Sequence, residues 1–193
     1  MTEKAPIPLT IALDVDNCLF PCMSIALNIL NKSFGWTLKE DDITDLRLSM
    51  QSEEVRTAYF ELMKTGVIYS LQTPKDGAVE LVESLQRIGH DVVFLTSPDP
   101  DRATTRAEQL LQFFPSVPQE NIILTYRKDL VCADVLLDDD IDFIKSSRAT
   151  HRFIFSKPWN RETLPGVQRT DSYENFVMRL ANIDGRRVAR ESA

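Results

Sequence analysis

The chain has 193 residues and a formal net charge of −7, with 43% hydrophobic and 26% charged residues. This length and composition are typical of one soluble globular domain, or of one domain with a small insertion. No apolar run approaches the roughly 20 residues of a membrane-spanning helix, and the first residues do not resemble a signal peptide, so we expect a cytoplasmic protein with no membrane partner.

The charge distribution argues against binding to long nucleic acid, because such binding needs a cluster of Lys and Arg that neutralises phosphates. The only basic cluster is formed by Arg186, Arg187 and Arg190, which we interpret as a solvated tail. A small anionic ligand remains compatible with the sequence, since a local site can oppose the global charge. A homodimer also remains open.

Three cysteines, Cys18, Cys22 and Cys132, are too few and too odd in number for a disulfide framework. Cys18 and Cys22 are spaced to share a helix face, but no His or second cysteine pair completes a zinc site. We therefore interpret the cysteines as reduced, buried thiols.

The first predicted strand is the apolar run 7–15, and it delivers two carboxylates, Asp14 and Asp16, at its end. In open α/β sheets, ligands bind at the carboxyl ends of the strands. Residues two apart share a face only while the strand stays extended, so a turn beginning after Asp14 would let both carboxylates approach one centre in different roles. The alternative is a strand that ends in ordinary polar turn residues.

Helical patterns at 25–30 and 55–63, with no good strand between them, predict a helical cap over 20–74. The cap would be inserted into a core made of 1–19 and 75–193. Aromatic side chains in this cap either pack its own small core or stack on a ring-bearing substrate. The candidates for stacking are Phe34, Trp36, Tyr59, Phe60 and Tyr69.

Apolar residues recur at helical spacing over 78–88, and Gly89 ends this helix. The strand that follows, 91–96, ends in two hydroxyl side chains, Thr96 and Ser97. Hydroxyls and free backbone N–H groups at such a point can hold a phosphate oxygen, although Ser/Thr turns are also common.

Asp99 and Pro100 are typical of an N-cap and a first-turn proline, and they predict a helix that continues through Leu111. A short apolar run over 121–125 predicts the next strand. Lys128 follows it. A lysine at this place could offset the negative charge of a nucleophile and a phosphate, but Arg127 competes for the role and a solvated surface lysine is the alternative.

The apolar run 134–138 predicts a further strand. Three consecutive carboxylates begin at the last residue of this run: Asp138, Asp139 and Asp140. Clustered carboxylates repel one another, and a cluster that stays ionised needs a cation. Oxygen-only ligands suit Mg²⁺, which accepts one or two protein carboxylates together with substrate phosphate. Asp140 could instead cap the next helix.

The last elements are a strand over 152–155 and a helix that Ser172 can cap. That helix carries Phe176, Val177 and Leu180. Continuous apolar strands that alternate with helices favour an α/β fold with a buried parallel sheet and right-handed crossovers.

These motifs resemble those of the haloacid dehalogenase (HAD) superfamily of phosphohydrolases. The four superfamily motifs match, in chain order, Asp14 with Asp16, Thr96, Lys128, and Asp138 with Asp139. Cys18 departs from the family, which usually has Thr or Val there, but that position is mainly structural. The resemblance implies an HAD-like Rossmannoid three-layer sandwich with a central parallel sheet and a small helical cap after the first strand.

A closer similarity is to the 5′(3′)-deoxyribonucleotidases, including the cytosolic type C enzymes and their bacterial and phage relatives. It extends from about residue 7 to 180. The segments that carry it are the inserted helical cap and residues 74–78, 95–98, 128, 136–139 and 155–160.

The resemblance implies a mechanism in which Asp14 attacks phosphorus and forms an aspartyl-phosphate that water hydrolyses. Asp16 would protonate the leaving alkoxide and then deprotonate the water. Mg²⁺ would be held by Asp14, by the backbone carbonyl of Asp16 and by an acid of the Asp138–Asp139 pair. Thr96, Ser97 and Lys128 would bind the phosphoryl oxygens.

The substrate implied is a deoxyribonucleoside monophosphate whose base stacks on cap aromatics. A phosphatase for another small metabolite, such as a sugar phosphate, remains an alternative, as does a non-catalytic relative that binds a phosphate ligand. Dehalogenases of the superfamily lack an acid at the position of Asp16, which argues against that activity. A nucleotidase-like cap argues against a phosphomutase.

Overall fold

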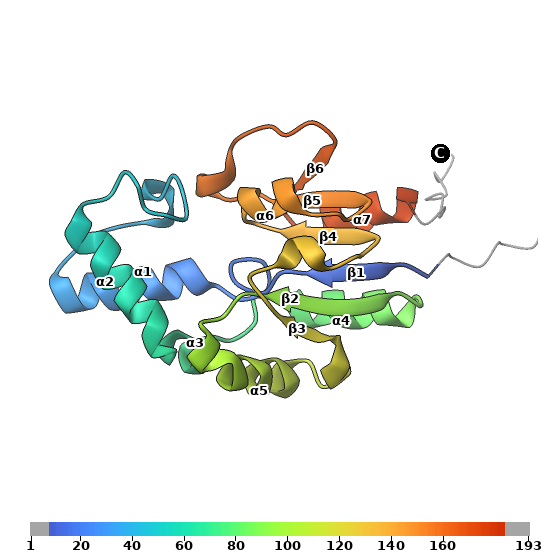
Figure 1. Cartoon of the computed structure of the whole chain (residues 1–193), viewed down its shortest axis with the longest axis horizontal. Helices are drawn as coiled ribbons and strands as arrows, with labels where there is room; N and C mark the ends of the chain where they lie inside the picture. The colour runs from blue at the N-terminus through green and yellow to red at the C-terminus, as the bar shows by residue number, and fades with distance from the viewer. Residues whose placement is uncertain (1–7, 184–193) are drawn as a thin grey trace, which may run out of the picture.

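The computed structural model describes residues 8–183 and has a six-stranded parallel sheet at its centre, in the order β3-β2-β1-β4-β5-β6 (Figure 1). The strands are β1 (Thr10–Leu13), β2 (Asp91–Thr96), β3 (Ile122–Leu124), β4 (Val135–Asp138), β5 (His151–Phe155) and β6 (Val167–Thr170). The start of the first predicted strand, at residue 7, and the basic cluster of Arg186, Arg187 and Arg190 lie outside the described residues.

Helices cover both faces of the sheet, because successive side chains of a buried strand point to opposite faces. Ile11 and Leu13 pack into the larger core, and Ala12 packs into the smaller core on the other side. The larger core also takes residues from α4 (Ala78–Arg87), α5 (Ala103–Phe113) and α7 (Tyr173–Ile183), and the smaller one from α6 (Ile141–Ser146). The predicted α/β fold with three layers is confirmed.

The helical insertion between β1 and α4 lies beyond the carboxyl ends of the strands (Figure 1). It contains α1 (Cys22–Phe34), the 3-10 helix η1 (Glu40–Asp42), α2 (Glu53–Thr65) and α3 (Val67–Leu71). The helices α1, α2 and α3 share a hydrophobic cluster of their own, which Trp159 joins from the core. We call this insertion the cap; its boundaries at 20–74 remain a prediction.

Short 3-10 helices connect the remaining elements: η2 (Pro100–Arg102), η3 (Gln119–Asn121), η4 (Lys128–Leu130) and η5 (Pro158–Asn160). Asp99 caps η2 by accepting a hydrogen bond from the Asp101 N–H, and α5 begins only after that turn. Ser172 accepts a hydrogen bond from the Asn175 N–H at the start of α7, as predicted.

The structure has one strand that the sequence analysis missed, and one expectation needs correction. The edge strand β6 was not predicted, because its sequence Val-Gln-Arg-Thr lacks the apolar run of a strand buried on both faces. Cys18 and Cys22 are buried thiols as expected, but Cys132 is exposed. Within residues 8–183, the structure has no helix that is long and apolar enough to cross a membrane.

Candidate active site

Two central strands bring their terminal carboxylates together. Leu13 of β1 is in register with Leu137 of β4, and the Asp14 N–H continues the ladder by donating to the Leu137 carbonyl at 2.8 Å. Asp14 therefore leaves β1 beside Asp138, the last residue of β4. This adjacency follows directly from the parallel arrangement, in which the carboxyl ends of strands share one edge.

Lys128 joins these two carboxylates. Its Nζ lies 2.6 Å from Asp14 Oδ1 and 2.8 Å from Asp138 Oδ2, and all three side chains are buried. Burial by itself lowers the pKa of Lys128, but the two carboxylates outweigh it and raise that pKa above its ordinary value. Arg127, the competing candidate, instead makes an ion pair with Asp129 at the surface. The structure thus brings Lys128, and not Arg127, to the carboxylates.

Asp139 is held by a different set of contacts. Its Oδ2 accepts hydrogen bonds from Trp159 Nε1 at 2.8 Å and from Asn17 Nδ2 at 3.3 Å. Its backbone carbonyl accepts one from Asn160 Nδ2 at 2.7 Å. Burial and the neighbouring Asp138 raise the pKa of Asp139 to about 7. Asp140 caps α6 through the Asp142 N–H, so it has the structural role that the sequence left open.

The side chains of Asp14, Cys18 and Asp139 could hold a metal ion, since one ligand atom from each lies within 4.8 Å of the others. Burial raises the pKa of Asp14 well above its ordinary value despite the opposing effect of Lys128. A cation would offset this buried negative charge. Burial also raises the pKa of the Cys18 thiol, which leaves a poor ligand, so the donor set is one of carboxylates and fits a hard cation such as Mg²⁺.

The chain turns after Asp16, at residues 17–19, and not directly after Asp14. The N–H groups of Leu19 and Phe20 both donate to the Val15 carbonyl, and Asn17 adopts a φ of 60°. Among the described residues, the Lys128 ammonium group contacts Asp14 and Asp138 but not Asp16. The Asp16 side chain is 24% exposed, lines the cavity described below and forms an ion pair with Arg106.

Thr96 and Ser97 follow β2 and also line the cavity. The Thr96 hydroxyl is buried and has no hydrogen-bond partner among the described residues. A buried hydroxyl without a partner is costly, and a ligand oxygen at this place would relieve that cost. The Ser97 hydroxyl differs, because it donates to the Thr125 carbonyl at 2.7 Å.

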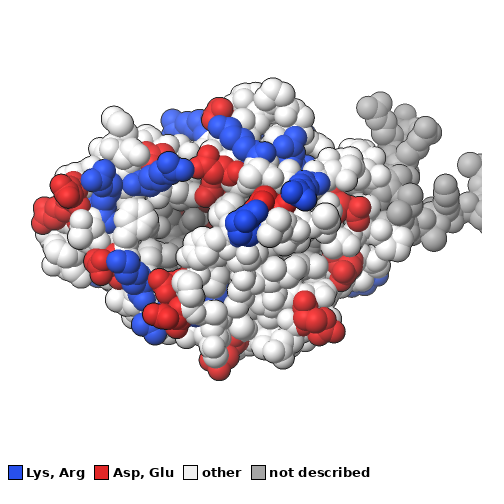
Figure 2. Space-filling model, viewed as in Figure 1, with Lys and Arg blue, Asp and Glu red and all other residues white. Residues whose placement is uncertain are grey.

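A cavity of about 360 Å³ lies over these residues, between the sheet and the cap, and Figure 2 shows the surface hollowed there. Its polar floor contains Asp14, Asp16, Thr96 and Lys128. Its wall also includes the charged residues Lys64 and Asp99, but most of it is apolar and aromatic and is formed by Leu46, Tyr59, Phe60, Met63, Tyr69, Tyr126 and Phe143. A polar floor under an aromatic wall suits a ligand with a charged end and a ring.

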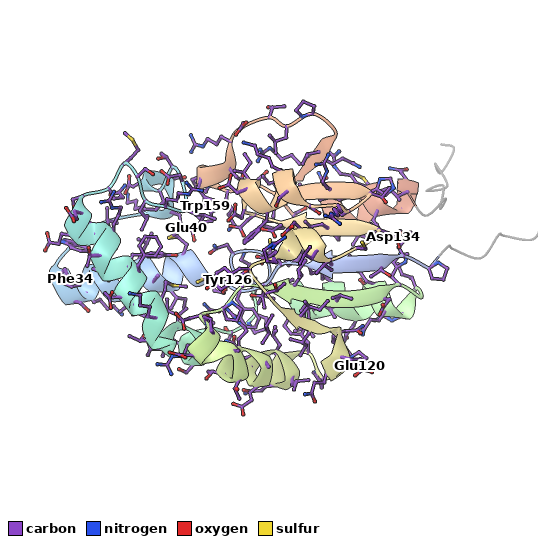
Figure 3. All side chains as sticks on the ribbon, in the orientation of Figure 1. Phe34, Glu40, Glu120, Tyr126, Asp134 and Trp159 are labelled. Carbon is purple, nitrogen blue, oxygen red and sulfur yellow. The ribbon has the colours of Figure 1, made fainter. Side chains whose placement is uncertain are left out.

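The five aromatic candidates divide into two groups. Tyr59, Phe60 and Tyr69 line the cavity, whereas Phe34 and Trp36 do not. The latter two stack on each other with ring centroids 4.5 Å apart, and Figure 3 places Phe34 at the end of the cap remote from the strands. Tyr126, which the sequence analysis did not single out, also lines the cavity and lies between the cap and the strands in Figure 3.

Sequence reasoning also missed Arg106 and Trp159. Arg106 could have been found, because it lies four residues before Leu110 and so places a charge on the buried face of a predicted helix. Trp159 lies in the segment 155–160 that carried the resemblance, but no pattern indicated its bond to Asp139. Arg106 contacts Asp16 across 90 positions of the sequence, and Trp159 contacts Asp139 across 20. Local sequence patterns do not reveal contacts of this kind.

Comparison with known proteins gives consistent matches. Residues 7–183 match the model of the family described as "5' nucleotidase, deoxy (Pyrimidine), cytosolic type C protein". A 5'(3')-deoxyribonucleotidase of Bacillus subtilis is 25% identical over 151 residues, which cover 78% of this chain and 87% of that protein. A putative 5'(3')-deoxyribonucleotidase of Staphylococcus epidermidis is 22% identical over 133 residues, covering 67% and 73%.

Solved structures agree on the fold. An HAD family hydrolase from Deinococcus radiodurans, solved with bound phosphate and sodium, has a TM-score of 0.66 at 14% identity, covering 93% of this chain and 97% of that one. A hydrolase from Pseudomonas syringae has a TM-score of 0.56 at 15% identity, covering 90% and 98%. With the family match over nearly all of its length, the chain belongs to the cytosolic type C deoxy-5′-nucleotidase family and is a phosphomonoester hydrolase, with a fold similar to that of the HAD hydrolases.

Proposed function

We propose that the protein is a Mg²⁺-dependent 5′(3′)-deoxyribonucleotidase, which releases phosphate from deoxyribonucleoside monophosphates through an aspartyl-phosphate on Asp14. The observation that carries this proposal is the buried contact of Asp14 with Lys128 at the floor of a cavity with an aromatic wall. The names of the bacterial relatives support the substrate class.

Asp14 is the proposed nucleophile, and its carboxylate would attack phosphorus in line with the leaving oxygen. An anion that attacks another anion needs nearby positive charge. Lys128 supplies one charge within hydrogen-bond distance of Asp14. Asp138, the other partner of Lys128, keeps the ammonium group in place between the two strands.

The divalent cation would be held by Asp14 and Asp139, with the backbone carbonyl of Asp16 as a further ligand. Asp139 is favoured over Asp138 because Asp138 is engaged by Lys128, whereas Asp139 belongs to the group of close potential ligands. When bound, Mg²⁺ neutralises charge between the nucleophile and the phosphate oxygens. Trp159 and Asn17 would orient the Asp139 carboxylate through their hydrogen bonds.

Thr96 and Lys128 are the proposed donors to the phosphoryl oxygens. The Thr96 hydroxyl needs no rearrangement to act, because it has no other partner among the described residues. Ser97 would contribute less through its hydroxyl, since that group already donates to Thr125. Fixed donors of this kind stabilise charge that develops in the transition state.

Asp16 is the proposed general acid and base. It lines the cavity without joining the Asp14–Lys128 contact, so it is available to a leaving oxygen. The carboxylic acid would give its proton to the departing alkoxide. The carboxylate would then take a proton from the water that attacks the aspartyl-phosphate.

The nucleoside would occupy the outer, aromatic part of the cavity. Phe60, which is 42% exposed, and Tyr126, which is 58% exposed, offer accessible ring faces. Tyr69 is less suited, because the Arg106 guanidinium lies over its ring at 3.9 Å.

The cytoplasmic location and a homodimer remain predictions.

The test is phosphate release from a panel of deoxyribonucleotides, ribonucleotides and sugar phosphates, each with Mg²⁺ and with EDTA. We expect Mg²⁺-dependent release with the highest kcat/KM on deoxyribonucleoside monophosphates. A preference for sugar phosphates would keep the mechanism and reject the nucleotidase assignment. Equal phosphate release in EDTA would reject the proposed requirement for a metal ion.

A further inference from the structure

Arg106 is a charged residue in the interior of the protein. It lies in α5, and its side chain is 0% exposed. A buried guanidinium costs several kcal/mol unless charged and polar partners surround it. Among residues 8–183, the one ion pair that it forms is with Asp16, which comes from a loop 90 positions away in the sequence.

Two further contacts fix the direction of this guanidinium, and a hydrogen bond between the two partners connects them. One terminal nitrogen donates to Gln109 Oε1 at 2.8 Å, one turn further along α5. The guanidinium carbon lies 3.9 Å from the centroid of Tyr69, which belongs to α3 of the cap. The Gln109 amide in turn donates to the Tyr69 carbonyl. Arg106 is thus held by the core on one side and by the cap on the other.

Asp16 has one further side-chain partner, the Cys22 thiol. It lies directly before the turn that contains the positive φ of Asn17, and its side chain remains partly exposed to the cavity. The bond from Arg106 to Asp16 Oδ1 restricts the rotation of this carboxyl group. Restriction matters for catalysis, because a displacement of about 1 Å can cost about 10²-fold in rate.

We propose that Arg106 is the positioning residue for Asp16, and that it links the orientation of this carboxyl group to the Tyr69 segment of the cap. The inference rests on the proposed function, in which Asp16 gives a proton to the leaving oxygen and later takes one from water. Arg106 itself touches neither substrate nor metal in this scheme. Its effect therefore reaches the reaction only through Asp16.

The first test is a double-mutant cycle with Arg106→Met, Asp16→Asn and the combined variant, assayed on a deoxyribonucleoside monophosphate. We expect Arg106→Met to lower kcat by about 10²-fold, with KM changed by less than about threefold. In the Asp16→Asn background, the same change should cost less than about threefold, since the group that Arg106 orients is already disabled. An equal loss in both backgrounds would overturn the inference.

The second test uses p-nitrophenyl phosphate, whose leaving group departs without a proton. In Arg106→Met, the pre-steady-state burst of p-nitrophenolate should stay within about threefold of wild type, because bond cleavage no longer needs Asp16. The turnover that follows should be slow, since the attacking water still needs a base. A burst reduced as strongly as nucleotide cleavage would indicate general damage to the site and would overturn the inference.

Arg102→Met is a matched control. Arg102 also links the core to the cap, because its Nε donates to the Lys64 carbonyl at 3.1 Å, but within residues 8–183 it forms no ion pair or hydrogen bond with Asp16. We expect its kcat to stay within about twofold of wild type. A loss like that of Arg106→Met would mean that any core–cap contact suffices, which contradicts a specific role of Arg106.

Arg106→Lys guards against a folding defect. Lysine keeps the charge and one bond to Asp16 but cannot also reach Gln109 and stack on Tyr69 as a planar group. It should recover part of the lost kcat, and it carries the cycle if Arg106→Met does not fold. No recovery in a folded Arg106→Lys protein counts against positioning. Full activity of Asp16→Asn would reject the proposed acid itself, whereas full activity of Arg106→Met alone would reject only the inference.

Discussion

The two sides of the cavity are built in opposite ways. The floor consists of polar side chains that follow strand ends, and at its centre Asp14 and Lys128 are buried and joined by an ion pair. The wall consists of larger apolar and aromatic side chains; Tyr59 and Tyr69 are buried, whereas Phe60 and Tyr126 are exposed. A rigid floor suits chemistry that requires fixed distances, and an accessible wall suits recognition of a variable group.

This contrast predicts that changes in the floor act on kcat and changes in the wall act on KM. The difference arises because floor residues would contact the reacting atoms, whereas the wall would contact the nucleoside equally in the ground and transition states. The predictions below test this division, and each measures both constants.

The largest effect is expected for Asp14→Asn. The amide is a far weaker nucleophile than the carboxylate, so kcat should fall on the order of 10⁴-fold or more. Phosphate release with Mg²⁺ and trapping of the acyl-phosphate with hydroxylamine measure it. If the variant retained turnover or a trapped adduct, Asp14 would not be the nucleophile, and the proposed mechanism would be wrong.

Thr96→Val should lower kcat by about 10²–10³-fold, the usual cost of removing one donor to a developing oxyanion. Valine has nearly the same shape and removes a buried hydroxyl that has no partner among the described residues. The thermal stability of the ligand-free protein should therefore stay the same or rise slightly. A clear loss of stability would show that the hydroxyl serves the fold and not a ligand.

Phe60→Ala and Tyr126→Ala test the wall. Stacking of a base on an aromatic ring contributes about 1–3 kcal/mol, so KM for a deoxyribonucleotide should rise about 5- to 150-fold with little change in kcat. Phe34→Ala is the control, because Phe34 is 51% exposed and does not line the cavity. Equal KM values in all three variants would show that the nucleoside does not contact this wall.

The smallest effect concerns stability. The pKa values of Asp14 and Asp139 are raised in the folded state, that of Asp139 to about 7, so the folded protein binds more protons than the unfolded chain between about pH 4 and pH 7. These groups therefore make the free energy of unfolding fall as the pH rises through that window.

In the metal-free protein, Asp139→Asn should flatten this loss of Tm between pH 5 and pH 8, where each 1 kcal/mol corresponds to about 2–4 °C. Mg²⁺ should raise the Tm of wild type more at pH 8 than at pH 5, because the cation binds ionised carboxylates. An equal Mg²⁺ effect at both pH values, or one retained in Asp139→Asn, would argue against Asp139 as a metal ligand.

The sequence by itself determined which predicted strands end in candidate catalytic residues. Apolar runs that end in Asp14, Thr96 or Asp138 are local patterns, and a parallel sheet places the ends of such runs at one edge. Ser172 and Asp140 as helix caps were equally local. The polar edge strand β6 escaped prediction, because its pairing with β5 carries no apolar signature.

Only the tertiary structure decided which side chains share a contact across long separations. Lys128 and Arg127 are neighbours in sequence, yet packing buries one against Asp14 and leaves the other at the surface. The same holds for Tyr59 and Phe34, since both lie in the cap but only Tyr59 lines the cavity. Local patterns specify elements and their faces, whereas the partner of each face depends on how those elements pack, and packing is settled by the whole chain.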